Sequence, residues 1–168
     1  IKLCNSGVMI ARGKTLFSLL KQVKNNNSAH EFYLTDIVSN ADKEGLNVKY
    51  VNCSELEAQG VNTRQDLSEV ENQFQKNKRL EVMGNGVTLK DPSSIYFSYD
   101  TEIGEDTVIE PNVIFGPGVK IKNSVLIKSF SYLEGCEVKS NVTLGPFARI
   151  RPKTILEEGV KVGNFVEI

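Results

Sequence analysis

Few side chains in this sequence have the type and spacing that catalysis or metal binding requires. The single histidine, His30, could serve as a general base because imidazole titrates near neutral pH, but its polar surroundings before Tyr33 indicate a solvated loop. The cysteines Cys4, Cys53 and Cys136 are scattered and lack CxxC spacing. This pattern predicts reduced thiols rather than a zinc site or a disulfide framework.

The composition is that of a globular protein without a strongly charged surface. Of 168 residues, 24% are charged and 40% hydrophobic, with 20 Lys+Arg against 21 Asp+Glu. The near-neutral balance, with one short basic run at 76–79, argues against a nucleic-acid or anionic-membrane partner. The sequence lacks an apolar run of the roughly 18 residues that span a membrane and has no visible secretory signal. We therefore expect a cytoplasmic protein.

The second half of the sequence repeats with a period of six residues. Turn-forming residues recur two positions after each apolar anchor, and small or β-branched residues recur four positions after it. This pattern predicts a parallel β-helix with three hexads per coil, whereas an antiparallel sandwich would place apolar residues in the turn-forming column. One slip of phase between Leu133 and Val138 predicts an irregular coil or a short bulging loop. The anchors are Ile103, Ile109, Phe115, Ile121, Ile127, Leu133, then Val138, Leu144, Ile150, Leu156, Val162 and Ile168.

The first half predicts part of an α/β layer fold. A strand is expected over Leu3 to Ala11 and a helix over Lys14 to Lys24. A second helix starts at Thr35 or Asp36 and stops at Gly45, and a short strand follows over residues 47–52. Two strands are too few to form a covered sheet. We therefore expect residues 1–62 to be the closing part of a larger domain.

A long helix is expected between the two halves. Thr63 and Asp66 are spaced as a capping box, and helical spacing of apolar residues continues to about Met83. The other positions are mostly polar, which predicts a solvated connecting rod over residues 63–86. The β-helix domain then occupies residues 87–168.

Several short motifs, in order along the chain, carry a family resemblance. The sequence resembles the bacterial bifunctional N-acetylglucosamine-1-phosphate uridylyltransferase and glucosamine-1-phosphate N-acetyltransferase enzymes over essentially its whole length. Each motif alone is weak, but the ordered set is specific. The motifs are Asn5-Ser6-Gly7, residues 31–36 (EFYLTD), residues 60–64 (GVNTR), residues 89–92 (LKDP), residues 145–152 (GPFARIRP) and residues 163–167 (GNFVE).

The resemblance implies a fold and an assembly. It implies a partial Rossmann-like nucleotidyltransferase domain of the α/β class, joined by the long helix to a left-handed parallel β-helix. The hand is taken from the resemblance alone. It also implies a homotrimer through the β-helix, consistent with flat apolar faces expected near Val125 and Ile114 that would otherwise contact water.

The resemblance also implies a two-step synthesis of UDP-N-acetylglucosamine. The β-helix domain transfers acetyl from acetyl-CoA to glucosamine-1-phosphate, and the N-terminal domain then couples the product to UTP with Mg²⁺. By motif, Asn5 contacts the sugar or uridylyl product, Asn62 is an amide ligand of Mg²⁺ that also contacts the nucleotide sugar, and Tyr33 or Thr35 lines the sugar pocket. Arg151 corresponds to the arginine that binds the sugar phosphate, a role that suits a guanidinium group.

Without the resemblance, each of these residues has a simpler interpretation. Asn5 and Asn62 would be turn residues, and Arg149 and Arg151 would be solvated side chains of the coils.

The sequence also departs from the family pattern. It lacks the Gly-rich Arg/Lys loop that holds UTP, the Asp ligand of Mg²⁺, and the histidine base and acetyl-CoA site expected beyond Ile168. We therefore expect an internal fragment that is inactive alone. Two alternatives remain: a sugar-1-phosphate nucleotidyltransferase with a β-helix tail and no acetyl transfer, and a non-catalytic β-helix assembly protein.

Overall fold

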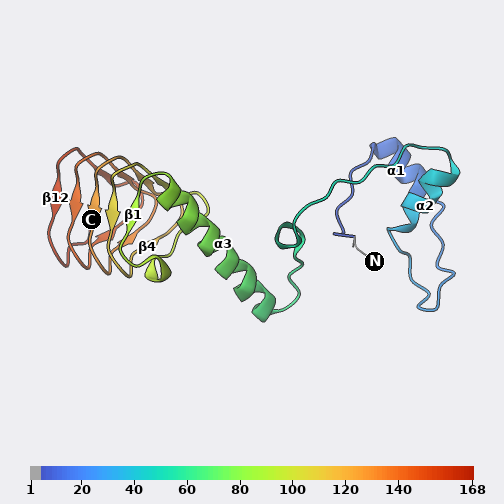
Figure 1. Ribbon diagram of the computed structural model, residues 1–168, viewed down its shortest axis with the longest axis horizontal. Coiled ribbons are helices and arrows are strands. Elements are labelled where there is room, and N and C mark those ends of the chain that lie inside the picture. The colour runs from blue at the N-terminus through green and yellow to red at the C-terminus, as the bar shows by residue number, and fades with distance from the viewer. Residues whose placement is uncertain (1–4) are drawn as a thin grey trace. The chain divides into compact units, whose positions relative to one another are not determined.

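A computed structural model describes residues 5–168, the side chains of residues 55 and 56 apart. The chain divides into two units, Ile1–Val61 and Asn62–Ile168, and each is described here by itself (Figure 1). The boundary falls just before the cap of the long helix, so that helix belongs to the second unit.

The first unit is built on two short helices that pack against each other. Helix α1 (Gly13–Leu20) and helix α2 (Asp36–Lys43) bury Leu19, Ile37 and Ala41 between them. Helix α2 ends as predicted at Gly45, whose φ of +70° lets the Leu46 N–H turn back to the Ala41 carbonyl at 3.0 Å. A single 3₁₀ turn, η1 (Glu55–Ala58), follows.

The two strands predicted for the first unit do not form within the described residues. The segment from Leu3 to Ala11, of which Leu3 and Cys4 lie outside the described residues, has no ladder partner, and neither has the segment 47–52. A strand needs a hydrogen-bonded neighbour, and these segments of β-type composition find none in this part of the chain.

The second unit is the predicted left-handed parallel β-helix. Its strands are two residues long, and the anchors from Ile109 to Val162 are buried, whereas Ile103 is partly buried and Ile168 is 45% exposed. Three parallel sheets form the three faces: β1-β3-β6-β9-β12 (face A), β4-β7-β10 (face B) and β2-β5-β8-β11 (face C). The strands are β1 (Thr88–Leu89), β2 (Glu102–Ile103), β3 (Val108–Ile109), β4 (Ile114–Phe115), β5 (Lys120–Ile121), β6 (Leu126–Ile127), β7 (Tyr132–Leu133), β8 (Glu137–Val138), β9 (Thr143–Leu144), β10 (Arg149–Ile150), β11 (Ile155–Leu156) and β12 (Lys161–Val162).

Residues stack on identical positions of the next coil, so the core is a column of apolar side chains. Ile109, Ile127 and Leu144 lie one above another on face A, and none of them is exposed to solvent. Val125, expected on an outer face, points inward and is 1% exposed, whereas Ile114 lies outside and is 44% exposed. The expectation was wrong for Val125 because the small residue four places after each anchor fills the interior of the corner.

The phase slip between Leu133 and Val138 produces a shorter corner, so the irregular coil forms here and not the alternative, a bulging loop. Residues 134–136 replace the longer turn 116–119 of the preceding coil, and the pairing of β5 with β8 continues unbroken. Gly135 makes this possible. Its φ is +52°, and a Cβ there would lie 3.0 Å from Pro152 Cβ.

Helix α3 (Arg64–Gly84) closes the first coil of the β-helix (Figure 1). The capping box predicted at Thr63 and Asp66 is present: Asp66 N–H donates to Thr63 Oγ1 at 3.1 Å, and Thr63 N–H donates to Asp66 Oδ2 at 2.9 Å. Farther along the helix, Gln75 is 2% exposed and Val82 is buried in the core of the β-helix. Although the sequence of this helix is mostly polar, Gln75 and Val82 pack it against the coils.

Among residues 5–168, no helix combines the length and the hydropathy needed to cross a bilayer.

Candidate functional site

Arg151, the predicted phosphate-binding residue, lies at the surface of the β-helix beside Glu167. Its Nε and Nη2 atoms donate to Glu167 Oε1 at 2.8 and 2.6 Å. Both side chains are exposed, by 60% for Arg151 and 47% for Glu167. An exposed ion pair of this kind contributes little to folding stability, so it leaves the arginine available for other contacts.

The repeat explains how these side chains meet. Arg149 is the outward residue of β10, and its backbone bridges to Glu167 one coil later. Ile150 points into the core and is fully buried, so Arg151 turns outward again after it. The coil thus delivers two arginines and one glutamate to the same patch of face B.

The patch carries a net positive charge. Arg149 Nε lies 3.5 Å from the same Glu167 Oε1 atom, so two guanidinium groups share one carboxylate and one positive charge remains. The guanidinium of Arg149 also lies over the ring of Tyr132, 6.0 Å from its centroid. Guanidinium N–H groups at an exposed surface are suited to a phosphate, which accepts charge-assisted hydrogen bonds.

The residues predicted to contact the nucleotide sugar lie mainly in the first unit. Asn5 is exposed, and its Oδ1 accepts the Gly7 N–H at 3.0 Å, as in a turn. Thr35 is the residue before α2 and makes no side-chain cap bond. Tyr33 lines a shallow hollow of about 350 Å³ with Leu20, Val23, Phe32 and Leu34.

Asn62 begins the second unit, whereas Asn5, Tyr33 and Thr35 belong to the first. Its backbone N–H donates to Asp66 Oδ2 at 3.0 Å. This bond and the bonds from Thr63 hold the pKa of the Asp66 carboxyl below its usual range.

The residues present do not form a magnesium site by themselves. Mg²⁺ requires several oxygen ligands in octahedral geometry, usually with one or two carboxylates. The nearby Asp66 carboxylate is engaged in capping α3, and no three His, Cys, Asp or Glu side chains of the described residues cluster as metal ligands. Asn62 could contribute one amide oxygen and no more.

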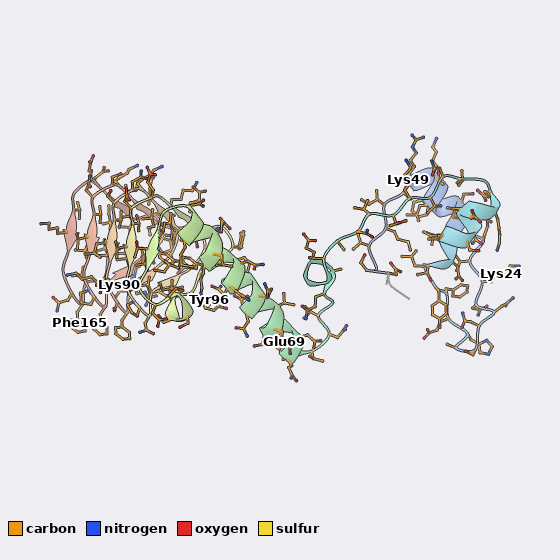
Figure 2. All side chains as sticks on the ribbon, viewed as in Figure 1. Lys24, Lys49, Glu69, Lys90, Tyr96 and Phe165 are labelled. Carbon is orange, nitrogen blue, oxygen red and sulfur yellow. The ribbon has the colours of Figure 1, made fainter. Side chains whose placement is uncertain are left out.

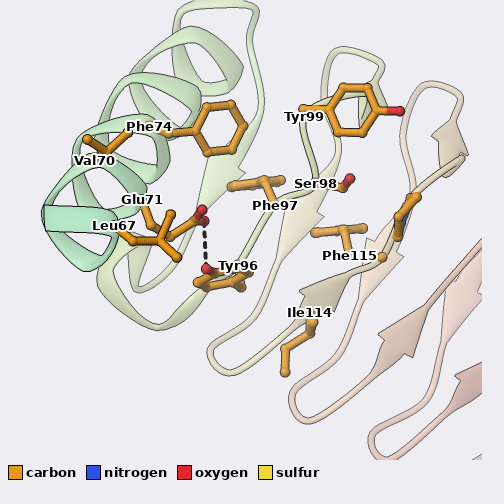
Figure 3. A pocket seen from close by; sticks show the side chains of 12 residues that line it. Leu67, Val70, Glu71, Phe74, Tyr96, Phe97, Ser98, Tyr99, Ile114 and Phe115 are labelled. Carbon is orange, nitrogen blue, oxygen red and sulfur yellow. Dashed lines mark hydrogen bonds between the residues drawn. The ribbon is translucent and has the colours of Figure 1, made fainter. Parts of the chain in front are cut away.

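A larger hollow of about 590 Å³ lies between α3 and the first coils (Figure 3). Leu67, Val70 and Phe74 of the helix face Tyr96 and Ile114 of the coils across it. Tyr96 Oη donates to Glu71 Oε1 at 2.6 Å, and this bond raises the pKa of Tyr96. The lining is otherwise mainly apolar, so the hollow does not bring together an acid, a base and a nucleophile.

The two described cysteines differ in reactivity. Cys53 is exposed, whereas Cys136 is 3% exposed inside the β-helix. Burial raises the pKa of the Cys136 thiol to about 11, which keeps it protonated and inert at neutral pH.

Glu167 and Gln75 were not predicted from the sequence to have a role. Glu167 stands in a recognised motif, and its partnership with Arg149 follows from the spacing of three hexads, which places residues 18 apart on adjacent rungs. The attachment of Gln75 to Phe97 had no comparable signal, because an isolated glutamine on a polar helix looks solvated.

These features define the second unit as a left-handed β-helix of hexapeptide repeats, closed at its first coil by a helix. The family described as "Bacterial transferase hexapeptide (six repeats)" matches residues 100–135.

Relatives extend the match to the whole chain. Over 168 residues it is 51% identical to the "Bifunctional protein GlmU" of Roseobacter denitrificans, 49% identical to that of Zymomonas mobilis and 46% identical to that of Sphingopyxis alaskensis. The chain spans 37% of the length of each of these relatives. The resemblance indicated by the ordered motifs is thus confirmed: the whole chain is homologous to a part of the bifunctional GlmU proteins.

Among solved structures, the chain matches the "Acetyltransferase domain of PglB from Neisseria gonorrhoeae FA1090 in complex with acetyl coenzyme A". The TM-score is 0.25 with 18% identity, covering 62% of this chain and 52% of that one. A likeness at this level carries no argument about function.

Proposed function

We propose that this chain is part of a bifunctional enzyme that makes UDP-N-acetylglucosamine in the cytoplasm. In the first reaction, acetyl passes from acetyl-CoA to glucosamine-1-phosphate. In the second, UTP and N-acetylglucosamine-1-phosphate give the nucleotide sugar and pyrophosphate. The observation that carries the proposal is the Arg149, Arg151 and Glu167 cluster, which has a net positive charge and lies within two of the family's motifs.

In this proposal Arg151 holds the phosphate of glucosamine-1-phosphate. Glu167 accepts from Nε and Nη2 of Arg151, which fixes the plane of the guanidinium group. The remaining N–H groups of Arg151 then face the phosphate oxygens and form charge-assisted hydrogen bonds. The acetyl-CoA site and the base for the attacking amine are expected in sequence beyond this chain.

The first unit would contribute to the uridylyltransferase domain, over residues 1–62. Tyr33 or Thr35 would line the sugar pocket, and Asn5 would contact the sugar or uridylyl product. Asn62 would supply one amide ligand to Mg²⁺, whose bound form neutralises phosphate charge during uridylyl transfer. Residues 63–86 would link this domain to the acetyltransferase domain at 87–168, and the protein would be a homotrimer through its β-helix.

Two assays on the natural gene product that contains this sequence test the proposal. With acetyl-CoA and glucosamine-1-phosphate, free CoA thiol should appear. With UTP, N-acetylglucosamine-1-phosphate and Mg²⁺, pyrophosphate should appear. Pyrophosphate release without thiol release would indicate a nucleotidyltransferase that only carries a β-helix tail, and the absence of both products would indicate a non-catalytic assembly protein.

A further inference from the structure

Three phenylalanine rings form an exposed ladder along one corner of the β-helix. Phe130, Phe147 and Phe165 occupy the same position in successive coils, at the corner between faces A and B. Their centroids are 5.0 and 4.8 Å apart, and neighbouring rings are tilted by 6°. The rings are 54%, 47% and 73% exposed, and Phe165 projects from the coils into solvent (Figure 2).

The backbone beneath this ladder is strained. The three phenylalanines have φ values of +61°, +58° and +55°, a left-handed conformation that bulky residues rarely adopt. The same column starts with Asn112, at φ +60°, in the preceding coil. The other two corners carry small or polar residues, or a lysine, at their left-handed positions: Asp106, Ser124, Asn141 and Gly159 at one, and Gly118, Gly135 and Lys153 at the other.

Packing inside the coils does not account for the ladder. The interior of this corner is already filled by Val113 and Ala148, which are 0% and 1% exposed, while the phenylalanine rings lie outside. An aromatic side chain at a strained position, repeated over three coils and left in water, indicates a contact made outside the coil.

The surroundings of the ladder indicate which side of the β-helix is covered. On face A, Val108 and Leu126 are half-buried outward residues, and on face B, Ile114 and Tyr132 occupy the equivalent positions. Face C lies opposite the ladder, and its outward residues are Glu102, Lys120 and Glu137, followed by Ile155 in the last coil.

Face C satisfies its charges within the chain. Lys120 Nζ lies 3.3 Å from Glu102 Oε1, and Lys139 Nζ lies 2.5 Å from Glu137 Oε1. This arrangement suits a face that stays in water. On the flanks of the ladder, the ion pairs are Lys90 with Glu110 on face A and the Arg149, Arg151 and Glu167 cluster on face B, whereas Val108, Leu126, Ile114 and Tyr132 are uncharged.

The period of the ladder specifies its occupant. One ring per coil presents ring edges at intervals of about one strand spacing. A surface that matches this period over three rungs is another β-helix with the same rise, and a second copy of this chain provides it.

We propose that Phe130, Phe147 and Phe165 are the edge through which copies of this chain associate, with the ladders meeting side by side around a threefold axis. The proposal rests on the homotrimer of the proposed function and assigns its contact residues. Each phenylalanine of the ladder contacts the same phenylalanine of the neighbouring copies, so all three residues with left-handed backbone contribute to the contact.

The triple variant Phe130→Asn/Phe147→Asn/Phe165→Asn tests the edge in the full chain. Asparagine already occupies this column at Asn112 and tolerates the left-handed backbone, so each coil should stay folded. In sedimentation velocity, the wild-type chain should be a trimer, and the triple variant should be monomeric with a dissociation constant raised roughly 100-fold or more. Lys153→Asn, at the left-handed position of another corner, is the matched control and should remain trimeric.

A trimer of unchanged affinity in the triple variant would overturn the assignment of the edge while leaving the trimer intact. A monomeric wild-type chain would overturn both the edge and the proposed trimer, independently of the two enzyme assays. If circular dichroism shows that the triple variant is unfolded, benzoylphenylalanine placed at position 147 of the otherwise wild-type chain decides the matter. Photo-crosslinks between the ladders of two copies support the proposal, and crosslinks confined to other faces, or none, contradict it.

Discussion

The side-chain amide of Gln75 and the backbone of Phe97 are joined by two hydrogen bonds, as two neighbouring strands would be. Gln75 Nε2 donates to the Phe97 carbonyl at 2.6 Å, and the Phe97 N–H donates to Gln75 Oε1 at 2.9 Å. Arg79 adds bonds from Nε and Nη2 to the Ile95 carbonyl at 3.1 and 2.8 Å. Helix α3 thus satisfies outward backbone groups of the first coil, which would otherwise form an open sheet edge.

Replacing Gln75 by methionine should destabilise the first coil. Methionine keeps most of the volume but leaves the buried N–H and carbonyl of Phe97 without partners, which should lower the free energy of unfolding by about 1–3 kcal/mol. Urea titration measures the loss, and amide exchange at Phe97 should accelerate. Gln73→Met is the matched control, because Gln73 bonds only to Asn77 on the exposed side of α3. Equal stability of the two variants would contradict the capping role.

Acidification should weaken the β-helix through Glu110. This carboxylate bonds to Lys90 Nζ at 2.8 Å and accepts from Ser129 N–H at 3.3 Å, so it links three coils and its pKa is lowered from 4.5. A lowered folded pKa means that the stabilisation is present above about pH 4.5 and is lost as the pH falls through the folded value. Glu110→Gln should therefore show a smaller loss of unfolding free energy between pH 6 and 3 than the wild type, and parallel pH profiles would refute this.

Gly135→Ala should destabilise the short corner. The added Cβ would meet Pro152 at 3.0 Å, and the residue would keep a φ of +52°. A loss of about 1–3 kcal/mol is expected in thermal or urea unfolding. Gly84→Ala serves as the control, because a Cβ there meets nothing within 4 Å, and it should be neutral or mildly stabilising. A neutral Gly135→Ala would show that this corner can relax.

Thiol labelling should separate the two described cysteines. Iodoacetamide at pH 8 should modify Cys53 rapidly, whereas Cys136 should react only after unfolding because it is buried and its pKa is about 11. Peptide mapping by mass spectrometry gives the rate at each site. Comparable native rates would mean that the coil around Cys136 opens readily.

The hexad pattern predicted the β-helix well because every coil requires the same types of residue at the same positions. Inward anchors such as Ile127 must be apolar, corners need turn formers, and a residue and its neighbour on the next coil are close to 18 positions apart. The register between strands of neighbouring coils then follows from the sequence, including the pairing of Arg149 with Glu167. The slip between Leu133 and Val138 was located correctly, and of its two expected forms the irregular coil is the one observed, because a shorter corner preserves the pairing that a bulge would disturb.

Features that depend on single contacts were not predictable in the same way. Gln75 lies on a helix whose sequence is mostly polar, so its burial depends on where α3 ends and the first coil begins. The two strands expected in the first unit were inferred from composition alone, which says nothing about partners. The positions of Tyr33, Thr35 and Asn5 as nucleotide-sugar contacts remain predictions for the same reason.

The Michaelis constant for glucosamine-1-phosphate in Arg151→Lys tests the proposed site most directly. It should be measured in the natural gene product, with Lys153→Arg as the control at a neighbouring exposed position. Lysine keeps the charge but loses the guanidinium bonds to Glu167 and to phosphate, so KM should rise about 10- to 100-fold while pyrophosphate release is unchanged. An unchanged KM for the sugar phosphate would contradict the assignment of Arg151 as its binding residue.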